Sequence, residues 1–176
     1  MNTKWYVITG APNSGKTTVI NSLAKLGYQT VPEIARILID EEMKKGKTLE
    51  DIRKNDMEFQ RKVLKVKIEI EKKLSKSKIV FLDRGIPDNI AYLQAYDLNY
   101  EDVLEFCKEK IYRKIFLLER FPFKKDYARI ENDETAEKLQ FLLRKVYSDL
   151  GYEVIGVPTV SVEERLKIIL SNIDSL

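Results

Sequence analysis

Short apolar runs alternate with longer amphipathic stretches along this sequence, and the alternation predicts strands separated by helices. Runs rich in apolar, aromatic and β-branched residues predict five strands, over residues 4–9, 28–31, 78–83, 114–118 and 152–157. Apolar residues that recur every three or four positions predict helices over residues 18–26, 33–45, about 52–74, about 101–110 and 135–150, with further helices after Pro87 and Ser161. Strands that alternate with helices predict an α/β fold, a parallel sheet with helices on both faces.

Local signals set several of the expected helix boundaries. Two capping boxes are expected, over residues 48–51 and 161–164, because a Thr or Ser in each is followed three positions later by an acidic residue. Gly27 and Gly151 are suited to end the helices before them in the left-handed conformation. Residues 65–71 also alternate with a period of two, which leaves a local strand open, but the helical period extends well beyond them and favours a helix.

The stretch from Gly10 to Thr17 reads Gly-Ala-Pro-Asn-Ser-Gly-Lys-Thr and matches the phosphate-binding pattern Gly-x-x-x-x-Gly-Lys-Ser/Thr, between a predicted strand and a predicted helix. Gly10 and Gly15 let the backbone turn tightly and approach phosphate closely. The backbone N–H groups of residues 13–17 can then converge on an anion at the positive end of the helix dipole. Lys16 is expected to reach the β- and γ-phosphates, and the hydroxyl of Thr17 to hold Mg²⁺.

The context of this loop favours binding of a nucleoside triphosphate over the alternative, a glycine-rich turn that binds nothing. The strand before it and the amphipathic helix after it are both expected from the hydrophobic pattern. The residues expected to bind the nucleotide are Gly10, Asn13, Ser14, Gly15, Lys16, Thr17 and Thr18.

Composition limits the remaining alternatives. With 176 residues, 44% of them hydrophobic and 34% charged, the chain is expected to form a single domain over residues 1–176. The net charge of +3 is small and the signs are interspersed, so the charge does not favour a nucleic-acid partner. Without a signal peptide or an apolar run of about 18 residues, no membrane span is expected, and the cytoplasm is the expected location. No histidine is present, which leaves acid–base work to carboxylates, Lys or Tyr.

In an open α/β sheet, ligands lie beyond the carboxyl ends of the strands, which directs attention to the residues that follow each strand. Asp83 ends the third predicted strand and is expected to bind Mg²⁺ with Thr17, the alternative being a carboxylate that caps the next helix. Glu33 follows the second strand and is the candidate general base, although a carboxylate at a helix N-terminus is also favoured there electrostatically. Arg36 lies one turn later and could hold an anionic group of a substrate.

Residues 120–131 are polar, basic and without periodicity, and they predict a loop or a mobile lid. Cations that fold over the γ-phosphate would stabilise the charge that develops in phosphoryl transfer. The candidates are Arg120, Lys124, Lys125 and Arg129, of which Arg120 and Arg129 are preferred. A basic loop that is merely solvated is the alternative.

Several motifs occur together in one order along the chain. They are Gly-x-Pro-x-x-Gly-Lys-Thr-Thr, Pro-Glu-x-x-Arg at Glu33 and Arg36, Phe59-Gln60, Leu82-Asp83-Arg84-Gly85 with Asp88, and Asp126-x-x-Arg129. This set resembles the P-loop ATPase family that contains the nicotinamide riboside kinase domain of a bacterial NAD-biosynthesis regulator and the eukaryotic translocation-defect protein, which binds GTP and phosphoinositides. It is similar, more distantly, to the thymidylate and deoxynucleoside kinases.

The resemblance implies a P-loop three-layer sandwich with a five-stranded parallel sheet in the order 2-3-1-4-5 and an adenine site near the loop after the fifth strand. In the deoxynucleoside kinases, the Glu after the second strand is the base and the Asp-Arg after the third handles metal and substrate. The resemblance therefore implies these roles for Glu33, Asp83 and Arg84. It also implies that Gln60 and Asp88 contact the substrate.

Two functions remain open at this point. The first is an ATP-dependent small-molecule kinase that uses ATP and Mg²⁺, with a nucleoside, nucleotide or similar small molecule as phosphoryl acceptor. Its catalytic residues would be Lys16, Glu33, Asp83, Arg84, Arg120 and Arg129, and its acceptor-binding residues Arg36, Gln60 and Asp88. The second is a nucleotide-binding regulatory ATPase or GTPase that binds a macromolecule or a lipid headgroup through the Lys-rich residues 61–78. We interpret that stretch instead as a solvated helix face with interleaved Glu69 and Glu71, and we expect a monomer or a homodimer.

Overall fold

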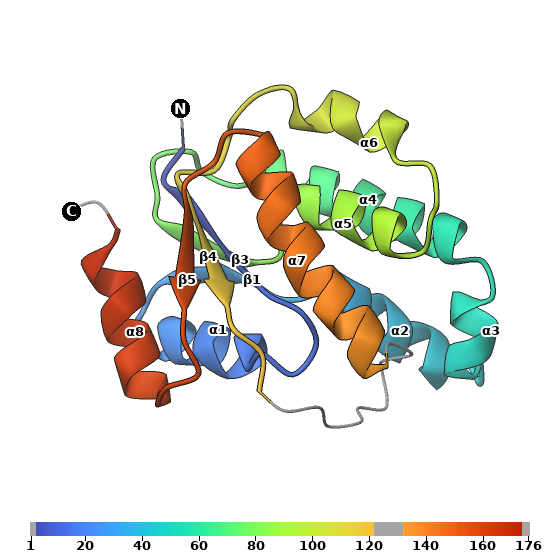
Figure 1. Ribbon diagram of the computed structural model, residues 1–176, viewed down its shortest axis with the longest axis horizontal. Helices are drawn as coiled ribbons and strands as arrows, with labels where there is room; N and C mark the ends of the chain where they lie inside the picture. Colours follow the sequence, from blue (N-terminus) through green and yellow to red (C-terminus); the bar gives the residue numbers. More distant parts are fainter. Residues whose placement is uncertain (1–2, 122–131, 174–176) are drawn as a thin grey trace.

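A parallel sheet of five strands forms the centre of the fold in the computed structural model, which describes residues 3–121 and 132–173 (Figure 1). The strands are β1 (Trp5–Thr9), β2 (Gln29–Val31), β3 (Val80–Asp83), β4 (Lys114–Leu118) and β5 (Val154–Val157), each within a predicted run. They pair in the order β2-β3-β1-β4-β5, and every pair is parallel. The predicted fold class and strand order are therefore confirmed.

Helices cover both faces of this sheet and complete a three-layer sandwich (Figure 1). On one face lie α1 (Lys16–Lys25) and α8 (Val162–Ser171). On the other face lie α2 (Ile34–Lys44), α4 (Asp56–Glu71), α5 (Pro87–Ala95) and α7 (Asp133–Asp149). The short helices α3 (Leu49–Arg53) and α6 (Glu101–Leu104) lie at the periphery, and a 3₁₀ turn over Glu105–Cys107 continues α6.

Alternation along β1 supplies apolar side chains to both layers. Tyr6 and Ile8 pack toward α1 and α8, where the rings of Tyr6 and Phe81 lie with centroids 5.6 Å apart. Trp5 and Val7 pack into the opposite cluster, which α2 and α4 cover. All five residues of β1 are buried, as expected for the central strand of a sheet with helices on both faces.

Two predicted helices differ from the structure. The helix expected over residues 52–74 is divided between α3 and α4, because the helical backbone is interrupted after Arg53. The Asn55 side chain then accepts a hydrogen bond from the Glu58 N–H (3.1 Å) and caps the start of α4. Residues 65–71 are helical, so the local strand is excluded. The helix expected over residues 101–110 is shorter and consists of α6 with its 3₁₀ turn.

The capping signals are confirmed. Both predicted capping boxes form, with the Thr48 and Ser161 hydroxyls accepting hydrogen bonds from the backbone three residues later, at 3.1 and 3.2 Å. Gly27 and Gly151 have φ angles of 89° and 76°, the left-handed conformation that ends a helix. Local chemistry therefore sets where α3 and α8 begin and where α1 and α7 end.

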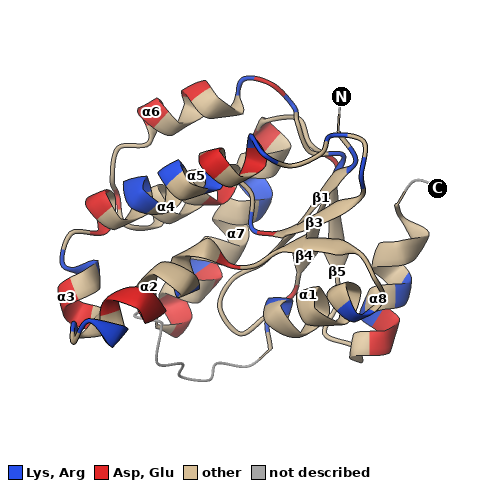
Figure 2. Cartoon of the chain, turned by 180° about the vertical axis from the view of Figure 1, so that it is seen from behind, with Lys and Arg blue, Asp and Glu red and all other residues tan. Residues whose placement is uncertain are grey.

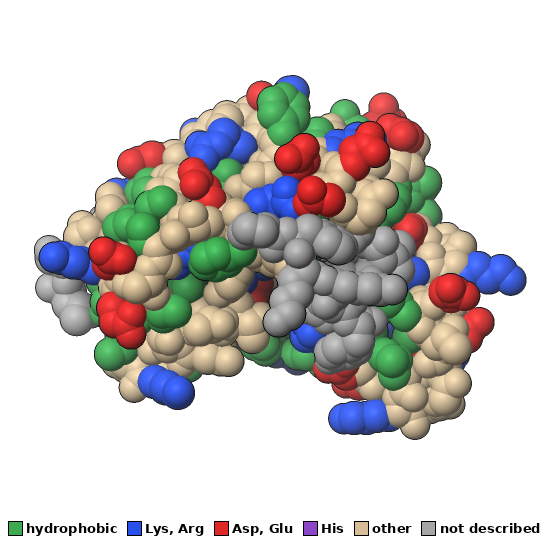
Figure 3. Space-filling view, turned by 60° about the horizontal axis from the view of Figure 1, so that its bottom comes forward, with side chains coloured by type: hydrophobic (Ala, Val, Ile, Leu, Met, Phe, Trp, Pro, Cys, Tyr) green, Lys and Arg blue, Asp and Glu red, His purple; other side chains and the backbone are tan. Residues whose placement is uncertain are grey.

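Charged side chains of both signs follow one another along the outer helices, whereas the strands carry few of them (Figure 2). On the face shown in Figure 3, the described Lys, Arg, Asp and Glu side chains are interspersed in the same way and gather into no patch of a single sign. No helix in the described part of the chain is long and apolar enough to cross a membrane.

The Lys-rich stretch of residues 61–78 is largely a solvated face, but Lys67 and Glu71 are buried, so the interpretation of Glu71 as a solvated residue is wrong. The Tyr112 hydroxyl donates to Glu71 Oε1 (2.8 Å) and accepts a hydrogen bond from the Ile86 N–H (2.9 Å). Tyr112 thereby connects α4 to the turn after β3. Burial raises the pKa of Glu71 to about 7, against the opposing effects of the Tyr112 hydrogen bond and of Lys67.

The raised pKa makes stability depend on pH. Between about pH 4.5 and 7 the folded protein holds a proton on Glu71 that the unfolded chain releases, so stability falls as pH rises through this range and levels off above it. Glu71→Gln, which does not titrate, is expected to gain stability relative to the parent protein between pH 5 and pH 8, by at most about 3 kcal/mol. Urea unfolding at both pH values measures this gain, with Glu69→Gln, exposed on the same helix, as the control. The same pH slope in Glu71→Gln and the parent protein would contradict the assignment.

Candidate functional site

The predicted phosphate loop joins β1 to α1 through a strongly bent backbone. The φ angle is +147° at Gly10, +62° at Asn13 and +77° at Gly15. A Cβ atom on Gly10 would lie 2.5 Å from the Leu118 carbonyl oxygen, so only glycine fits at this position. α1 begins at Lys16 with no side-chain cap and no acidic residue in its first turn. The first N–H groups and the dipole of α1 are therefore suited to bind an anion such as phosphate.

Lys16 folds back across this loop. Its side chain is buried, and Nζ donates to the Gly10 carbonyl (2.8 Å), the Ala11 carbonyl (3.1 Å) and Ser14 Oγ (3.0 Å). Thr17 and Thr18 are exposed in the first turn of α1. The residues predicted to bind the nucleotide thus all belong to one loop and the helix turn that follows it.

Arg165 of α8, which sequence reasoning missed, binds the backbone of the phosphate loop. Its side chain is 1% exposed and donates to three backbone carbonyls, those of Ser14, Glu119 and Pro158, at 2.5–3.2 Å. The guanidinium also stacks over the Phe121 ring, with 4.6 Å from Cζ to the ring centroid. These contacts connect the phosphate loop to the segments that follow β4 and β5.

Asp83 and Thr17 are the predicted metal ligands. Asp83 is buried at the end of β3, in register with Ile8 of β1, the strand that leads into the phosphate loop. Within residues 3–121 and 132–173, no group of three or more His, Cys, Asp or Glu residues could hold a metal by itself. A single carboxylate and a hydroxyl fit Mg²⁺, which proteins commonly bind through one or two side chains together with nucleotide phosphates.

Glu33 lies at the N-terminus of α2, buried beside two arginines. Arg84 Nε donates to Glu33 Oε1 (3.1 Å), and Arg36 Nε lies 3.8 Å from Glu33 Oε2. Arg84 has a φ angle of +71°, a conformation that costs free energy for any residue with a Cβ and often marks a functional position. The structure thus brings four predicted residues, Glu33, Arg36, Asp83 and Arg84, to the carboxyl ends of β2 and β3.

Asp88 accepts four hydrogen bonds and is 1% exposed. Its Oδ1 accepts from Thr9 Oγ1 (2.5 Å) and Arg84 Nη1 (3.1 Å), and its Oδ2 accepts from the Gly85 N–H (2.9 Å) and the Tyr147 hydroxyl (2.5 Å). These contacts join β1, the turn after β3 and α7. Because both oxygens are engaged, Asp88 is suited to position Arg84, and its direct contact with a substrate stays a prediction.

Arg84 carries its charge inside the protein. Burial opposes the charged guanidinium, but four neighbours favour it and hold the pKa of Arg84 well above its usual value: Tyr92, Glu33, Asp88 and Asp83. Its Cζ atom lies 5.1 Å from the centroid of the Tyr92 ring. Arg84 is therefore a permanent positive charge at the edge of the sheet where ligands bind in such folds.

A small cavity, called the inner pocket from here on, lies between α2, α3, α4 and α5. It is lined by Glu33, Ala35, Ile39, Arg53, Phe59, Gln60, Val63, Lys67, Arg84, Asp88, Asn89 and Tyr92. Its volume is about 20 Å³, room for about one water molecule, so a larger ligand would have to displace side chains. One such side chain is Arg53, whose Cζ lies 5.1 Å from the centroid of the Phe59 ring.

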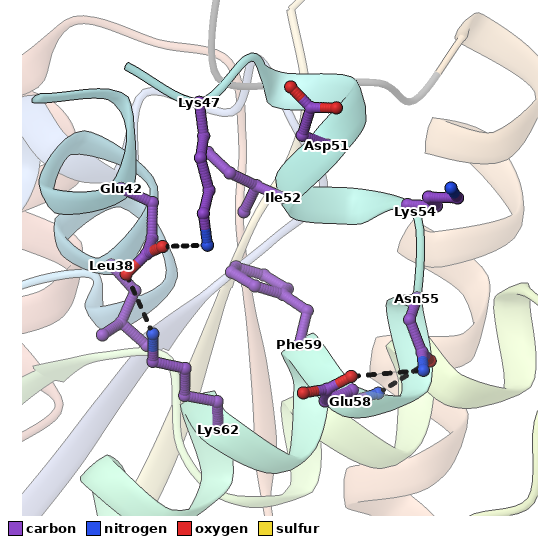
Figure 4. A pocket seen from close by; sticks show the side chains of 10 residues that line it. All are labelled: Leu38, Glu42, Lys47, Asp51, Ile52, Lys54, Asn55, Glu58, Phe59 and Lys62. Atoms are coloured by element: carbon purple, nitrogen blue, oxygen red, sulfur yellow. Dashed lines mark hydrogen bonds and ion pairs between the residues drawn. The ribbon is translucent and has the colours of Figure 1, made fainter. Parts of the chain in front are cut away.

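A larger cavity of about 540 Å³, called the outer cavity, lies between α2, α3 and α4 (Figure 4). Lys47 and Lys62 reach Glu42 there, at 2.6 and 3.3 Å, and hydrogen bonds from Lys47, Lys45 and Lys62 lower the pKa of Glu42 to about 2. Phe59 lines both cavities and so forms a shared wall. None of the predicted site residues lines the outer cavity.

Of the predicted catalytic lid residues, only Arg120 lies within the described part of the chain. Arg120 is partly exposed and forms ion pairs with Asp133 and Glu137 at the start of α7. Arg129 lies outside the described residues, as do residues 122–131 of the predicted lid. The catalytic roles of Arg120 and Arg129 stay predictions.

Two of the residues that sequence reasoning missed, Lys67 and Arg165, had a periodic signal. Lys67 follows the apolar Val63 by four positions on α4, and Arg165 precedes the apolar Ile169 by four positions on α8, so each shares a helix face with a core residue. A charged residue on an apolar face is a candidate for a buried, partnered role. Asn89 carried the same signal, because it precedes the buried Leu93 by four positions on α5. Arg53 gave no such signal, since it ends the five-residue α3.

The sheet order and the loop after β1 define a P-loop fold. The chain belongs to the AAA domain family, whose model matches residues 5–165. No curated protein sequence matches it significantly. The resemblance to the eukaryotic translocation-defect protein stays a prediction.

Solved structures with a similar fold include deoxyadenosine kinase from M. mycoides with bound dCTP, at 16% identity and a TM-score of 0.69, covering 98% of this chain and 100% of that one. The NadR protein in complex with NR is 15% identical with a TM-score of 0.70, and the match covers 99% of this chain but 52% of that one. Shikimate kinase from Acinetobacter baumannii in complex with shikimate is 21% identical with a TM-score of 0.57, covering 96% and 93%. At these identities the likeness shows the fold.

The contacts of Arg165 predict that it supports nucleotide binding without touching the nucleotide. Arg165→Met is expected to weaken ATP binding about tenfold or more, because the Ser14 carbonyl loses a charged donor and the loop loosens. Arg165→Lys should retain part of the affinity, since an ammonium can replace one of the three hydrogen bonds. Isothermal titration of ATP measures both, with Lys167→Met, exposed on the same helix, as the control. Parental affinity in Arg165→Met would contradict this role.

Proposed function

We propose that the chain is an ATP-dependent kinase that transfers the γ-phosphoryl group of ATP to a hydroxyl group of a small molecule. The observation that supports this most is the buried arrangement of Glu33, Arg84 and Asp88 beside the phosphate loop. A carboxylate that can accept a proton, a fixed guanidinium and a phosphate-binding loop are the groups that phosphoryl transfer to a hydroxyl uses.

In this proposal the phosphate loop binds ATP. Lys16 turns from the carbonyls of Gly10 and Ala11 toward the β- and γ-phosphates, and the N–H groups of residues 13–17 surround them. Asp83 and Thr17 would hold Mg²⁺, which neutralises phosphate charge when it is bound. The electrostatic environment is then positive where negative charge develops.

The transfer step needs a base and a fixed geometry. The acceptor oxygen forms a bond to the γ-phosphorus while the bond from this phosphorus to the β–γ bridging oxygen breaks, and ADP leaves. Glu33 takes the proton of the hydroxyl. Arg84, which Asp88 positions, holds the Glu33 carboxylate in place and adds positive charge beside it. An acceptor that is itself a phosphate would need no base, and Arg36 and Arg84 would then hold it.

Structural neighbours support the size of the proposed acceptor. They are described as deoxyadenosine kinase, thymidylate kinase, shikimate kinase and a NadR protein in complex with NR. The molecules in these names are small and carry hydroxyl or phosphate groups. We propose a nucleoside-sized acceptor. We also propose that residues 1–176 form a single domain, that the protein is cytoplasmic, and that it is a monomer or a homodimer.

The small volume of the inner pocket favours a second candidate. A nucleotide-binding regulatory ATPase or GTPase needs no room for a small acceptor and would use Glu33 and Arg84 to respond to the bound nucleotide. Transfer of labelled γ-phosphate decides between the two. The acceptors are deoxyadenosine, nicotinamide riboside, thymidine monophosphate and shikimate, with water as the control. Labelling of one acceptor about 100-fold above hydrolysis supports the kinase, whereas hydrolysis alone across the panel overturns it.

The proposed base has a specific kinetic consequence. Glu33→Gln keeps the shape of the side chain but removes the proton acceptor, so kcat for a hydroxyl acceptor is expected to fall about 10²- to 10⁴-fold while ATP affinity changes little. Initial-rate assays at varied concentrations of the best acceptor measure kcat and KM separately. Glu41→Gln, exposed on the same helix, controls for the loss of one charge. Transfer at the parental rate in Glu33→Gln would exclude Glu33 as the base.

A further inference from the structure

One wall of the inner pocket contains a chain of three hydrogen-bonded side chains. Lys67 Nζ donates to the Gly85 carbonyl (2.8 Å) and to Asn89 Oδ1 (2.8 Å). Asn89 Nδ2 in turn donates to the Gln60 carbonyl (3.1 Å) and to Gln60 Oε1 (3.1 Å). Lys67, Asn89 and Gln60 are all buried, with 6%, 1% and 6% of their surface exposed.

The donor and acceptor properties of these groups fix the direction of the chain. An ammonium has donors only, so the Asn89 atom that faces Lys67 must be the oxygen. The Asn89 amide nitrogen then faces Gln60, and it can be satisfied there only by oxygen atoms. Gln60 Oε1 is therefore engaged, and its Nε2 is the group left to interact with anything else.

Gln60 lines the pocket, and its Nε2 has no hydrogen-bond partner among residues 3–121 and 132–173. Its neighbours on α4 along the same wall are the apolar Phe59 and Val63. A flat apolar group with one hydrogen-bond-accepting atom at its edge matches such a surface, because the donor would be satisfied and the apolar faces covered.

We propose that Lys67 is a positioning residue that acts through Asn89 to make Gln60 a hydrogen-bond donor toward the phosphoryl acceptor. The acceptor then carries a lone pair, such as a ring nitrogen or a carbonyl oxygen, at the point where it meets Gln60. A group that can only donate at that point is rejected, since two donors would face each other in a buried site. The inference rests on the proposed function, because it describes the molecule that receives the phosphoryl group.

A purely structural role for Lys67 is the competing account. Burial lowers the pKa of Lys67, and the carboxylates of Asp88, Glu71 and Glu33 favour its charged form, so Lys67 could simply balance charge. That role would affect stability but not the choice between acceptors. The two accounts therefore differ in selectivity, which steady-state kinetics can measure.

The first experiment compares deoxyadenosine with its 1-deaza, 3-deaza and 7-deaza analogues, each of which replaces one ring nitrogen by a C–H group. In the parent protein, one analogue is expected to lose about tenfold or more in kcat/KM, mainly through KM, because Gln60 Nε2 loses its partner. In Lys67→Met the same analogue should differ from deoxyadenosine by about threefold or less. Lys67→Arg, which keeps a charged donor, should restore part of the discrimination, and Lys65→Met, exposed on the same helix, should match the parent.

The second experiment needs no turnover. In ¹⁵N NMR spectra, the side-chain amide of Asn89, assigned from its loss in Asn89→Ala, is expected to exchange with solvent at least about tenfold more slowly in the parent protein than in Lys67→Met. Equal exchange in the two proteins overturns the proposal, whatever the substrate. Equal use of all the analogues by a parent protein that phosphorylates deoxyadenosine also overturns it, as does a Lys67→Met variant that only lowers Tm. Slow exchange in a protein that phosphorylates no acceptor supports the chain of hydrogen bonds while refuting the kinase.

Discussion

The buried charge of Arg84 is the constraint on which the rest of the site depends. A guanidinium inside a protein is tolerated only with carboxylates and hydrogen bonds around it, and removing one partner of such a pair typically costs about 3–5 kcal/mol. Glu33 and Asp88 supply the carboxylates, from α2 and from α5. Because Asp88 also binds Thr9 and Tyr147, the position of Arg84 is tied to β1 and α7. The candidate base and its cationic neighbour are thus fixed by the core of the fold.

The phosphate loop is likewise held by residues of other elements. Arg165 reaches from α8 to the Ser14 carbonyl, and the Phe121 N–H donates to the Asn13 carbonyl (2.8 Å). Residues from the last helix and from the segment after β4 therefore shape a loop near the start of the chain. The two sides meet at the carboxyl ends of the strands, and so a donor phosphate and an acceptor hydroxyl could be held close together there.

Most of the fold could be predicted because its signals are local. Apolar runs located the strands, the phosphate loop located the first crossover, and the Thr48 capping box located α3. The break before α4 was missed, since the Asn55 cap lies inside a helical hydrophobic pattern. In the site, motif positions such as Glu33 and Arg84 could be named from sequence, but their partners could not. The roles of Lys67 and Arg165 depend on carbonyls and amides that other elements bring to them, and the ion pairs of Arg120 depend on where α7 begins.

In the proposed kinase, Arg84 and Asp88 hold Glu33 where it can take a proton from the acceptor hydroxyl. A crystal structure with Mg²⁺, the non-hydrolysable ATP analogue AMP-PNP and the acceptor that is phosphorylated fastest would test it most directly. We expect a Glu33 carboxylate oxygen about 3 Å from the acceptor hydroxyl, with that hydroxyl facing the γ-phosphate and Arg84 still bound to Asp88. A hydroxyl that faces the γ-phosphate but lies beyond hydrogen-bond reach of Glu33, directly or through one water, would contradict it.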